Sequence, residues 1–126
     1  MKRVLVADDD PVSRGLIRDA LSSLRYDVVE ASNGEEALLK MVEAQPDLIL
    51  LDIEMPLLDG YEVLQRVRDN PSLSHLPVAA ITAQALPADR ERGLAKGFAA
   101  YLTKPIGIAA LRTEVEHLLS PDAKRR

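Results

Sequence analysis

Polar side chains that could carry out phosphate chemistry follow four of the apolar runs in the chain. Asp8 and Asp9 come directly after the first run, Asp52 after the third, Thr82 after the fourth and Lys104 shortly after the fifth. Carboxylates that lie close together repel one another, and a hard divalent cation such as Mg²⁺ relieves that repulsion. An ammonium group and a hydroxyl group can hold phosphate oxygens. The set therefore predicts a phosphoryl-transfer site, in which one carboxylate could be the nucleophile and form an aspartyl phosphate.

Each of these residues also has an ordinary structural explanation when it is considered alone. A carboxylate after a strand often serves in a turn, and Asp10 can cap a helix that begins at Pro11. Thr82 can simply end a strand, and Lys104 can be a solvated lysine. The chemical interpretation therefore depends on the elements that would bring these residues together.

Short apolar runs alternate with helical patterns along the whole chain. Apart from the weak second strand at residues 27–30, the runs are continuously apolar, which is typical of parallel strands that are covered on both faces. The sequence therefore predicts an α/β fold, namely a flavodoxin-like doubly wound (βα)5 domain with a parallel five-stranded sheet of order 2-1-3-4-5. Ligands of such sheets bind beyond the carboxyl ends of the strands, where the candidate site residues stand. The runs cover residues 4–7, 27–30, 48–51, 78–81 and 99–102.

Apolar spacing predicts which side chains of the first two helices are buried. We expect the two leucines Leu57 and Leu58, which follow Asp52, to place at least one side chain inward, with an apolar rim for a partner as the alternative. The residues expected on buried helix faces are Val12, Leu16, Ile17, Ala20, Leu21 and Leu24 in the first helix, and Ala37, Leu38, Met41 and Val42 in the second.

Composition excludes several classes of function. The chain has 126 residues, no cysteine, no tryptophan and a formal net charge of −4. The lack of cysteine excludes a disulfide scaffold and a thiolate metal site. The acidic balance argues against nucleic acid as a partner. No apolar run approaches the roughly 20 residues of a membrane span, so we expect no membrane partner and a cytoplasmic protein.

Five short motifs resemble those of the receiver domains of two-component response regulators, of the single-domain CheY-like or DivK-like type. The resemblance spans residues 2–119, and it rests on the order and spacing of the motifs together. The motifs are Val4-Leu5-Val6-Ala7-Asp8-Asp9-Asp10-Pro11, Leu50-Leu51-Asp52-Ile53-Glu54-Met55-Pro56, Asp59-Gly60, Ile81-Thr82-Ala83 and Tyr101-Leu102-Thr103-Lys104-Pro105.

The resemblance implies a nucleophile and a set of metal ligands. Asp52 matches the phosphoacceptor of the family. Asp9 matches the direct Mg²⁺ ligand, Asp8 matches the partner that holds metal-bound water, and the backbone carbonyl of Glu54 matches a further ligand. With Asp52 itself, these groups make up the expected Mg²⁺ site.

The resemblance also implies how the phosphorylated state is held and sensed. Thr82 and Lys104 match the residues that bind phosphoryl oxygens. Tyr101 matches an aromatic residue whose inward or outward position changes together with Thr82. The peptide between Lys104 and Pro105 matches one that is cis in the family.

Partners follow from the same resemblance. The phosphoryl donor would be a histidine kinase or a histidine phosphotransfer protein that docks on the helix at residues 11–24. The signal would pass to an unknown downstream protein. The helix, strand and helix near residues 87–119 resemble the family's output face, through which a homodimer could form. The chain would not be an enzyme beyond self-phosphorylation and autodephosphorylation of Asp52.

Two alternatives remain open from the sequence. A pseudo-receiver would be a binding module that is never phosphorylated. A Mg²⁺-dependent phosphohydrolase would use Asp52 as its nucleophile and a second carboxylate two residues later, where Glu54 stands. We expect a receiver domain over residues 1–120 and a polar tail at residues 121–126. If the chain is complete, its output must then be a contact made by the receiver itself.

Overall fold

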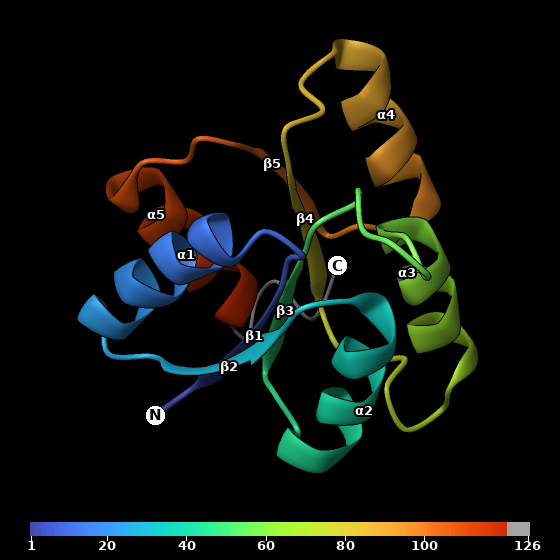
Figure 1. Ribbon diagram of the computed structural model, residues 1–126, viewed down its shortest axis with the longest axis horizontal. Helices are drawn as coiled ribbons and strands as arrows, with labels where there is room; N and C mark the ends of the chain where they lie inside the picture. The colour runs from blue at the N-terminus through green and yellow to red at the C-terminus, as the bar shows by residue number, and fades with distance from the viewer. Residues whose placement is uncertain (121–126) are drawn as a thin grey trace.

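The computed structural model describes residues 1–120 as one parallel sheet flanked by helices (Figure 1). The strand order is β2-β1-β3-β4-β5, which confirms the predicted (βα)5 topology. The predicted tail at residues 121–126 lies outside the described residues. Within residues 1–120, no helix is both long and apolar enough to cross a membrane. The elements are β1 (Arg3–Ala7), α1 (Pro11–Ser23), β2 (Asp27–Ala31), α2 (Gly34–Ala44), β3 (Leu48–Leu51), α3 (Gly60–Asp69), β4 (Val78–Thr82), α4 (Pro87–Lys96), β5 (Ala100–Thr103) and α5 (Ile108–Leu119).

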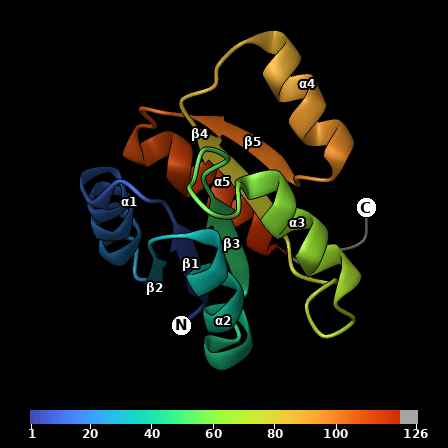
Figure 2. The same cartoon turned by 45° about the vertical axis from the view of Figure 1, so that its right-hand side comes forward.

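Helices cover both faces of the sheet, so the strands bury side chains on both sides. Helices α1 and α5 lie on one face, and α2, α3 and α4 lie toward the other (Figure 2). Val4 and Val6 of β1 belong to the core with α1 and α5, whereas Leu5 and Ala7 belong to the opposite core. This alternation explains why the last four residues of β1, all of β3 and the first four residues of β4 are apolar without interruption, whereas β2, which is only partly buried, carries Asp27 and Glu30.

Side chains cap the three helices that begin nearest the N-terminus. Asp10 accepts a hydrogen bond from the N–H of Val12, as predicted, and Asn33 accepts one from the N–H of Glu36 at the start of α2. Asp59 caps α3. Gly97 ends α4 in the left-handed region, with φ at 114°. Gly107 precedes α5 and offers no capping side chain.

Three apolar side chains that the helical spacing assigned to the core are exposed instead. Val12 and Leu16 on α1 are 70% and 68% exposed, and Val42 on α2 is 59% exposed. Of the apolar stripe on α1, only Ile17 and Leu21 are fully buried. The apolar stripe is wider than the strip of helix surface that the sheet covers, so the prediction for its outer residues was wrong.

Candidate functional site

The carboxylates of Asp8, Asp9 and Asp52 form a cluster at the carboxyl edge of the sheet. Strands β1 and β3 are parallel neighbours with Ala7 opposite Leu51, so the residues that follow them emerge side by side. One carboxylate oxygen from each of the three aspartates lies within 4.8 Å of the other two. Asp8 and Asp52 are buried, while Asp9 is exposed. The structure thus brings together the three acids that the sequence placed at the strand ends.

Backbone N–H groups hold the two buried carboxylates in place. The N–H of Asp10 donates to Oδ1 of Asp8 over 3.0 Å. The N–H of Glu54 donates to Oδ1 of Asp52 over 3.1 Å. In both residues Oδ1 therefore accepts from the backbone N–H two residues later, while Oδ2 faces the ammonium group of Lys104.

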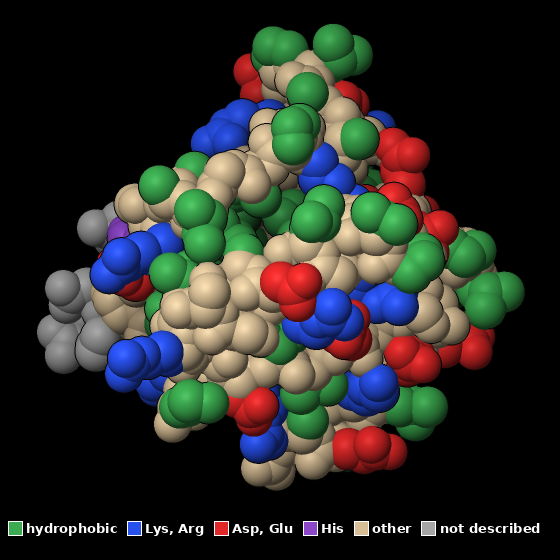
Figure 3. Space-filling view, turned by 60° about the vertical axis from the view of Figure 1, so that its left-hand side comes forward, with side chains coloured by type: hydrophobic (Ala, Val, Ile, Leu, Met, Phe, Trp, Pro, Cys, Tyr) green, Lys and Arg blue, Asp and Glu red, His purple; other side chains and the backbone are tan. Residues whose placement is uncertain are grey.

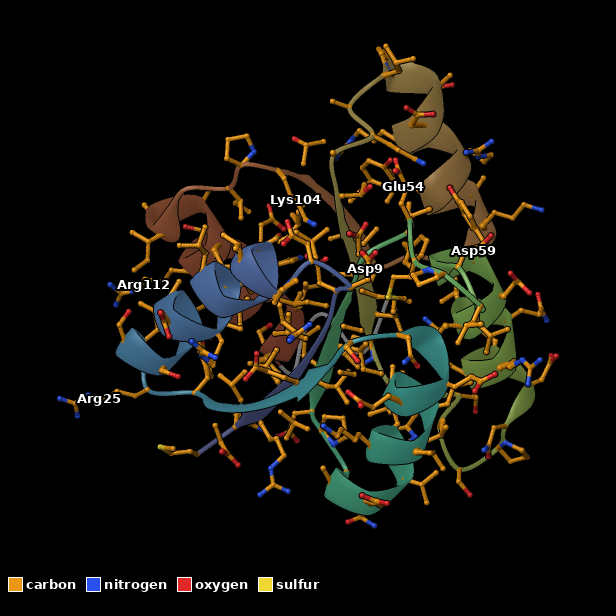
Figure 4. The ribbon with its side chains drawn as sticks, viewed as in Figure 1. Asp9, Arg25, Glu54, Asp59, Lys104 and Arg112 are labelled. Atoms are coloured by element: carbon orange, nitrogen blue, oxygen red, sulfur yellow. The ribbon has the colours of Figure 1, made fainter. Side chains whose placement is uncertain are left out.

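The ammonium group of Lys104 joins the two buried carboxylates. Its Nζ lies 2.6 Å from Oδ2 of Asp8 and 2.9 Å from Oδ2 of Asp52. The backbone N–H of Lys104 donates to the carbonyl of Thr82 over 2.9 Å, which fixes the start of the loop that carries the lysine. The Lys104–Pro105 peptide is cis, as the resemblance implied. Lys104, Asp9 and Glu54 reach the same end of the sheet from three separate loops (Figure 4).

Burial and pairing act in opposite directions on these groups. Burial raises the pKa of Asp52 above its usual value, and hydrogen bonding to Lys104 offsets this only in part. Burial also acts to raise the pKa of Asp8, but hydrogen bonds from Lys104 and Asp10 outweigh it and lower that pKa. Burial acts to lower the pKa of Lys104, yet its two carboxylate partners raise it overall. The lysine therefore stays charged between the acids.

The donor set fits Mg²⁺. Three carboxylates against one ammonium leave two formal negative charges in the cluster, which match a divalent cation. Mg²⁺ takes oxygen ligands and commonly uses one or two carboxylates together with water and phosphate oxygens. Asp9 is exposed and therefore accessible to a hydrated ion. The backbone carbonyl of Glu54 is the further expected ligand. The N–H of the same residue donates to Asp52, which keeps Glu54 next to the cluster.

The loop after Asp52 folds back closely onto the start of α3. A Cβ at Gly60 would lie 2.7 Å from Cα of Ile53 and 2.8 Å from the carbonyl oxygen of Asp52, so no larger residue fits there. Leu58 is buried, while Leu57 is 74% exposed with φ at 70°. The expectation that at least one of these two leucines packs inward is confirmed.

Thr82 and Tyr101 meet at Gln84. Thr82 is buried at the end of β4, and its Oγ1 accepts a hydrogen bond from the N–H of Gln84 over 3.3 Å. The hydroxyl of Tyr101 donates to the carbonyl of Gln84 over 2.8 Å, and the ring is buried. Among residues 1–120, the buried side-chain oxygen of Gln84 finds no hydrogen-bond partner. Tyr101 thus occupies an inward position, and hydrogen bonds to Gln84 connect it to Thr82.

Comparison with known proteins identifies the family. A model of the response regulator receiver domain matches residues 4–116. The chain belongs to the response regulator receiver domain family. Receiver domains are signalling modules of two-component systems that interact with histidine kinases and downstream targets, and they are not classical enzymes. The family assignment confirms the resemblance that the five motifs indicated.

Solved receiver structures share this fold over most of their length. Chemotaxis response regulator CheY4 of Vibrio cholerae is 30% identical, with a TM-score of 0.87 over 94% of this chain and 99% of that one. The receiver domain of sensor histidine kinase PA1611 from Pseudomonas aeruginosa is 33% identical, with a TM-score of 0.86 over 94% of this chain and 97% of its own. That structure has a magnesium ion coordinated in its active-site cleft.

Curated relatives include both short and long proteins. The polar-differentiation response regulator DivK of Brucella anthropi is 39% identical over 107 residues, which are 85% of this chain and 87% of DivK. The gliding motility regulatory protein of Myxococcus xanthus is 38% identical over 117 residues. That match covers 92% of this chain but only 15% of the Myxococcus protein. Receiver domains like this one therefore occur both nearly alone and within much longer chains.

Two residues beside the site were not predicted from the sequence. Arg14 donates from Nη1 to the backbone carbonyl of Asp8 over 2.8 Å. Gly93 on α4 lies against the ring of Tyr101. The available signals were an arginine in the first turn after the acidic residues, and a glycine inside a helix, where it lowers helix stability by about 1 kcal/mol relative to alanine.

Proposed function

We propose that this receiver domain accepts a phosphoryl group on Asp52 from a phosphohistidine of a histidine kinase or a histidine phosphotransfer protein. The observation that carries the proposal is the bridge of Lys104 between Asp8 and Asp52, within a carboxylate cluster that fits Mg²⁺. A cation next to a nucleophilic carboxylate is what phosphoryl transfer requires, because the reaction depends chiefly on positioning and on charge stabilisation.

The transfer step uses one carboxylate oxygen of Asp52. That oxygen attacks phosphorus, so a P–O bond forms while the P–N bond to the donor histidine breaks. The electron pair of the broken bond stays on the imidazole nitrogen. The N–H of Glu54 and the ammonium of Lys104 hold Asp52 in one orientation before the reaction, which lowers the entropic cost of reaching the reactive geometry.

Charge neutralisation is shared among several groups. Asp8, Asp9, Asp52 and the carbonyl of Glu54 would hold Mg²⁺, which supplies positive charge to the phosphoryl oxygens when it is bound. Lys104 already lies within hydrogen-bond distance of Asp52 and can pair with a phosphoryl oxygen there. The hydroxyl of Thr82 can donate to another.

Phosphorylation would bias the arrangement of Thr82 and Tyr101. If Thr82 turns its hydroxyl toward the phosphoryl group, its contact with the N–H of Gln84 changes. Tyr101 binds the carbonyl of that same Gln84, so the change reaches β5 and the adjacent helix α4. Output would then pass through the surface of α4, β5 and α5 to a downstream protein or to a second copy of the chain.

Incubation with acetyl phosphate and Mg²⁺ tests the proposal. We expect one added phosphate by intact mass, stable in acid and lost in alkali, and we expect Asp52→Asn to abolish it. Asp19→Asn is the matched control, because Asp19 is an exposed acid on α1. Failure of the wild type to form an adduct would contradict the proposal in favour of a pseudo-receiver. Rapid turnover of unrelated phosphomonoesters would contradict it in favour of a phosphohydrolase.

A further inference from the structure

The guanidinium group of Arg14 is held between the acidic loop and β2. Its Nη1 donates to the backbone carbonyl of Asp8 over 2.8 Å, and its Nε donates to Oε1 of Glu30 over 3.1 Å. Arg14 stands on the first turns of α1, directly after the loop that carries Asp8 and Asp9. A planar guanidinium that donates in two directions fixes its own orientation and that of both acceptors.

We infer that Arg14 positions the loop that carries Asp8 and Asp9, and that its contact with the Asp8 carbonyl increases the affinity of the acidic cluster for Mg²⁺. This inference rests on the proposed function. The Asp8 carbonyl belongs to the peptide group that joins Asp8 to Asp9. Because that group is planar, a hydrogen bond to its oxygen restrains the backbone from which the Asp9 side chain extends. Asp9 is the exposed member of the cluster, so its backbone is where positioning matters most.

The acceptor on the other side of Arg14 is itself well anchored. Arg18, one turn further along α1, donates from Nη1 to Oε2 of Glu30 over 3.3 Å. The backbone carbonyl of Glu30 accepts a hydrogen bond from Lys40 of α2. The side chains of Arg14 and Glu30 are only 19% and 31% exposed, so their pair is better shielded from solvent than a surface ion pair. Glu30 therefore gives Arg14 a firm support.

Position and charge make opposite predictions for Arg14. As a positive charge near three carboxylates, Arg14 opposes the binding of a cation, so its removal by charge alone would strengthen Mg²⁺ binding. As a positioning residue it supports binding, so its removal would weaken it. Arg18 carries the same charge on the same helix and shares Glu30, but its hydrogen bonds go to Asp19 and Glu30 and not to Asp8. Arg18 is therefore the control for charge, because its bond to Oε2 of Glu30 is longer and more exposed, and its loss leaves the bonds of Arg14 to Oε1 of Glu30 and to the Asp8 carbonyl in place.

The test is a calorimetric titration of the unphosphorylated full chain with MgCl₂. We expect Arg14→Gln to weaken Mg²⁺ binding by about 10-fold, the lower end of what loss of an outer contact to a metal ligand costs. Arg14→Lys keeps the charge but replaces the two guanidinium donors, Nε and Nη1, with a single flexible ammonium nitrogen that cannot reproduce their fixed geometry, so we expect this variant to bind Mg²⁺ more weakly than the wild type as well. Arg18→Gln should bind Mg²⁺ as tightly as the wild type or slightly more tightly.

A second readout separates positioning from a general structural role. With acetyl phosphate as donor, the rate of phosphorylation of Arg14→Gln should approach the wild-type rate once Mg²⁺ is raised to saturation. Glu30→Gln, which loosens the support without touching the loop, should shift Mg²⁺ affinity in the same direction and keeps the inference testable if Arg14→Gln fails to fold.

Two results would overturn the inference, and they are distinguishable. Wild-type Mg²⁺ affinity in both Arg14→Gln and Glu30→Gln, or tighter binding in Arg14→Gln, would remove the role of Arg14 and leave the proposed function standing. Absence of Mg²⁺ binding by the wild type itself would overturn the inference and the proposed function together.

Discussion

The ring of Tyr101 lies directly against the backbone of Gly93. A Cβ at position 93 would stand 2.5 Å from Cδ2 and 2.8 Å from Cε2 of that ring. Arg90 of the same helix donates to the backbone carbonyl of Tyr101 over 2.8 Å. Helix α4 is thus fitted around the inward position of Tyr101, which is the residue that the proposed switch would move.

On the other side of the molecule, Figure 3 shows hydrophobic side chains gathered over α1 and α5, where Val12 and Leu16 are exposed.

Gly93→Ala should destabilise the domain, because the added methyl group collides with the Tyr101 ring. Overpacking of this kind costs about 1–3 kcal/mol in the free energy of unfolding, which outweighs the gain of about 1 kcal/mol in helix propensity. Urea denaturation of the variant measures the difference. Gly15→Ala on α1 is the control, since its Cβ would meet only the end of the Arg18 side chain at 3.5 Å, and it should stabilise the fold. An equal loss for Gly93→Ala in a Tyr101→Ala background would contradict this explanation.

The phenol of Tyr101 should ionise at a pH above the ordinary pKa of tyrosine. Burial, with smaller contributions from Asp89 and Tyr61, raises the pKa of Tyr101 above 10.0. Because the folded pKa exceeds the unfolded one, the neutral phenol contributes stability that is complete below pH 10.0 and is lost as pH rises through the folded pKa. Absorbance titration of the wild type minus Tyr101→Phe measures the midpoint. A difference curve with its midpoint at or below the ordinary value would contradict the buried, hydrogen-bonded position.

Much of the fold could be predicted from the sequence because most of its strands coincide with short apolar runs, β2 with Asp27 and Glu30 being the weakest of them. The strand order and the carboxyl edge followed from that pattern. The exposure of Val12, Leu16 and Val42 could not be predicted, because helical spacing shows an apolar stripe but not how much of it the sheet covers. That depends on the packing of whole helices, which a local pattern does not contain.

The acids of the site could likewise be predicted, since Asp8 and Asp52 follow strands that are adjacent in the sheet. The contact of Arg14 with the Asp8 carbonyl and the fit of Gly93 against Tyr101 could not. Both depend on distances between a side chain or a backbone atom and an element elsewhere in the fold. Sequence spacing within one helix holds no information about such distances.

Lys104→Ala should separate metal binding from phosphoryl acceptance. Without the ammonium group nothing competes with a cation for Asp8 and Asp52, so Mg²⁺ should bind more tightly by calorimetry. The rate of Asp52 phosphorylation by acetyl phosphate should fall about 100-fold, a typical loss for one charge-stabilising donor. The domain should remain folded by circular dichroism. Lys96→Ala, on the exposed end of α4, should change neither quantity. A Lys104→Ala variant that is phosphorylated at the wild-type rate would contradict the role of this lysine.

Gly107→Ser should stabilise the domain by improving the start of α5. Gly107 has extended backbone angles, with φ at −71° and ψ at 154°, and a Cβ there would meet no atom within 4 Å. A serine can adopt these angles without strain and lose less chain entropy on folding, and its hydroxyl can accept from the first free N–H groups of the helix. Together these effects should add about 0.5–1 kcal/mol to the free energy of unfolding. Urea denaturation compares Gly107→Ser with Gly107→Ala, which also reduces the loss of chain entropy on folding but has no hydroxyl group. Equal stability of the two variants would show that capping contributes nothing at this position.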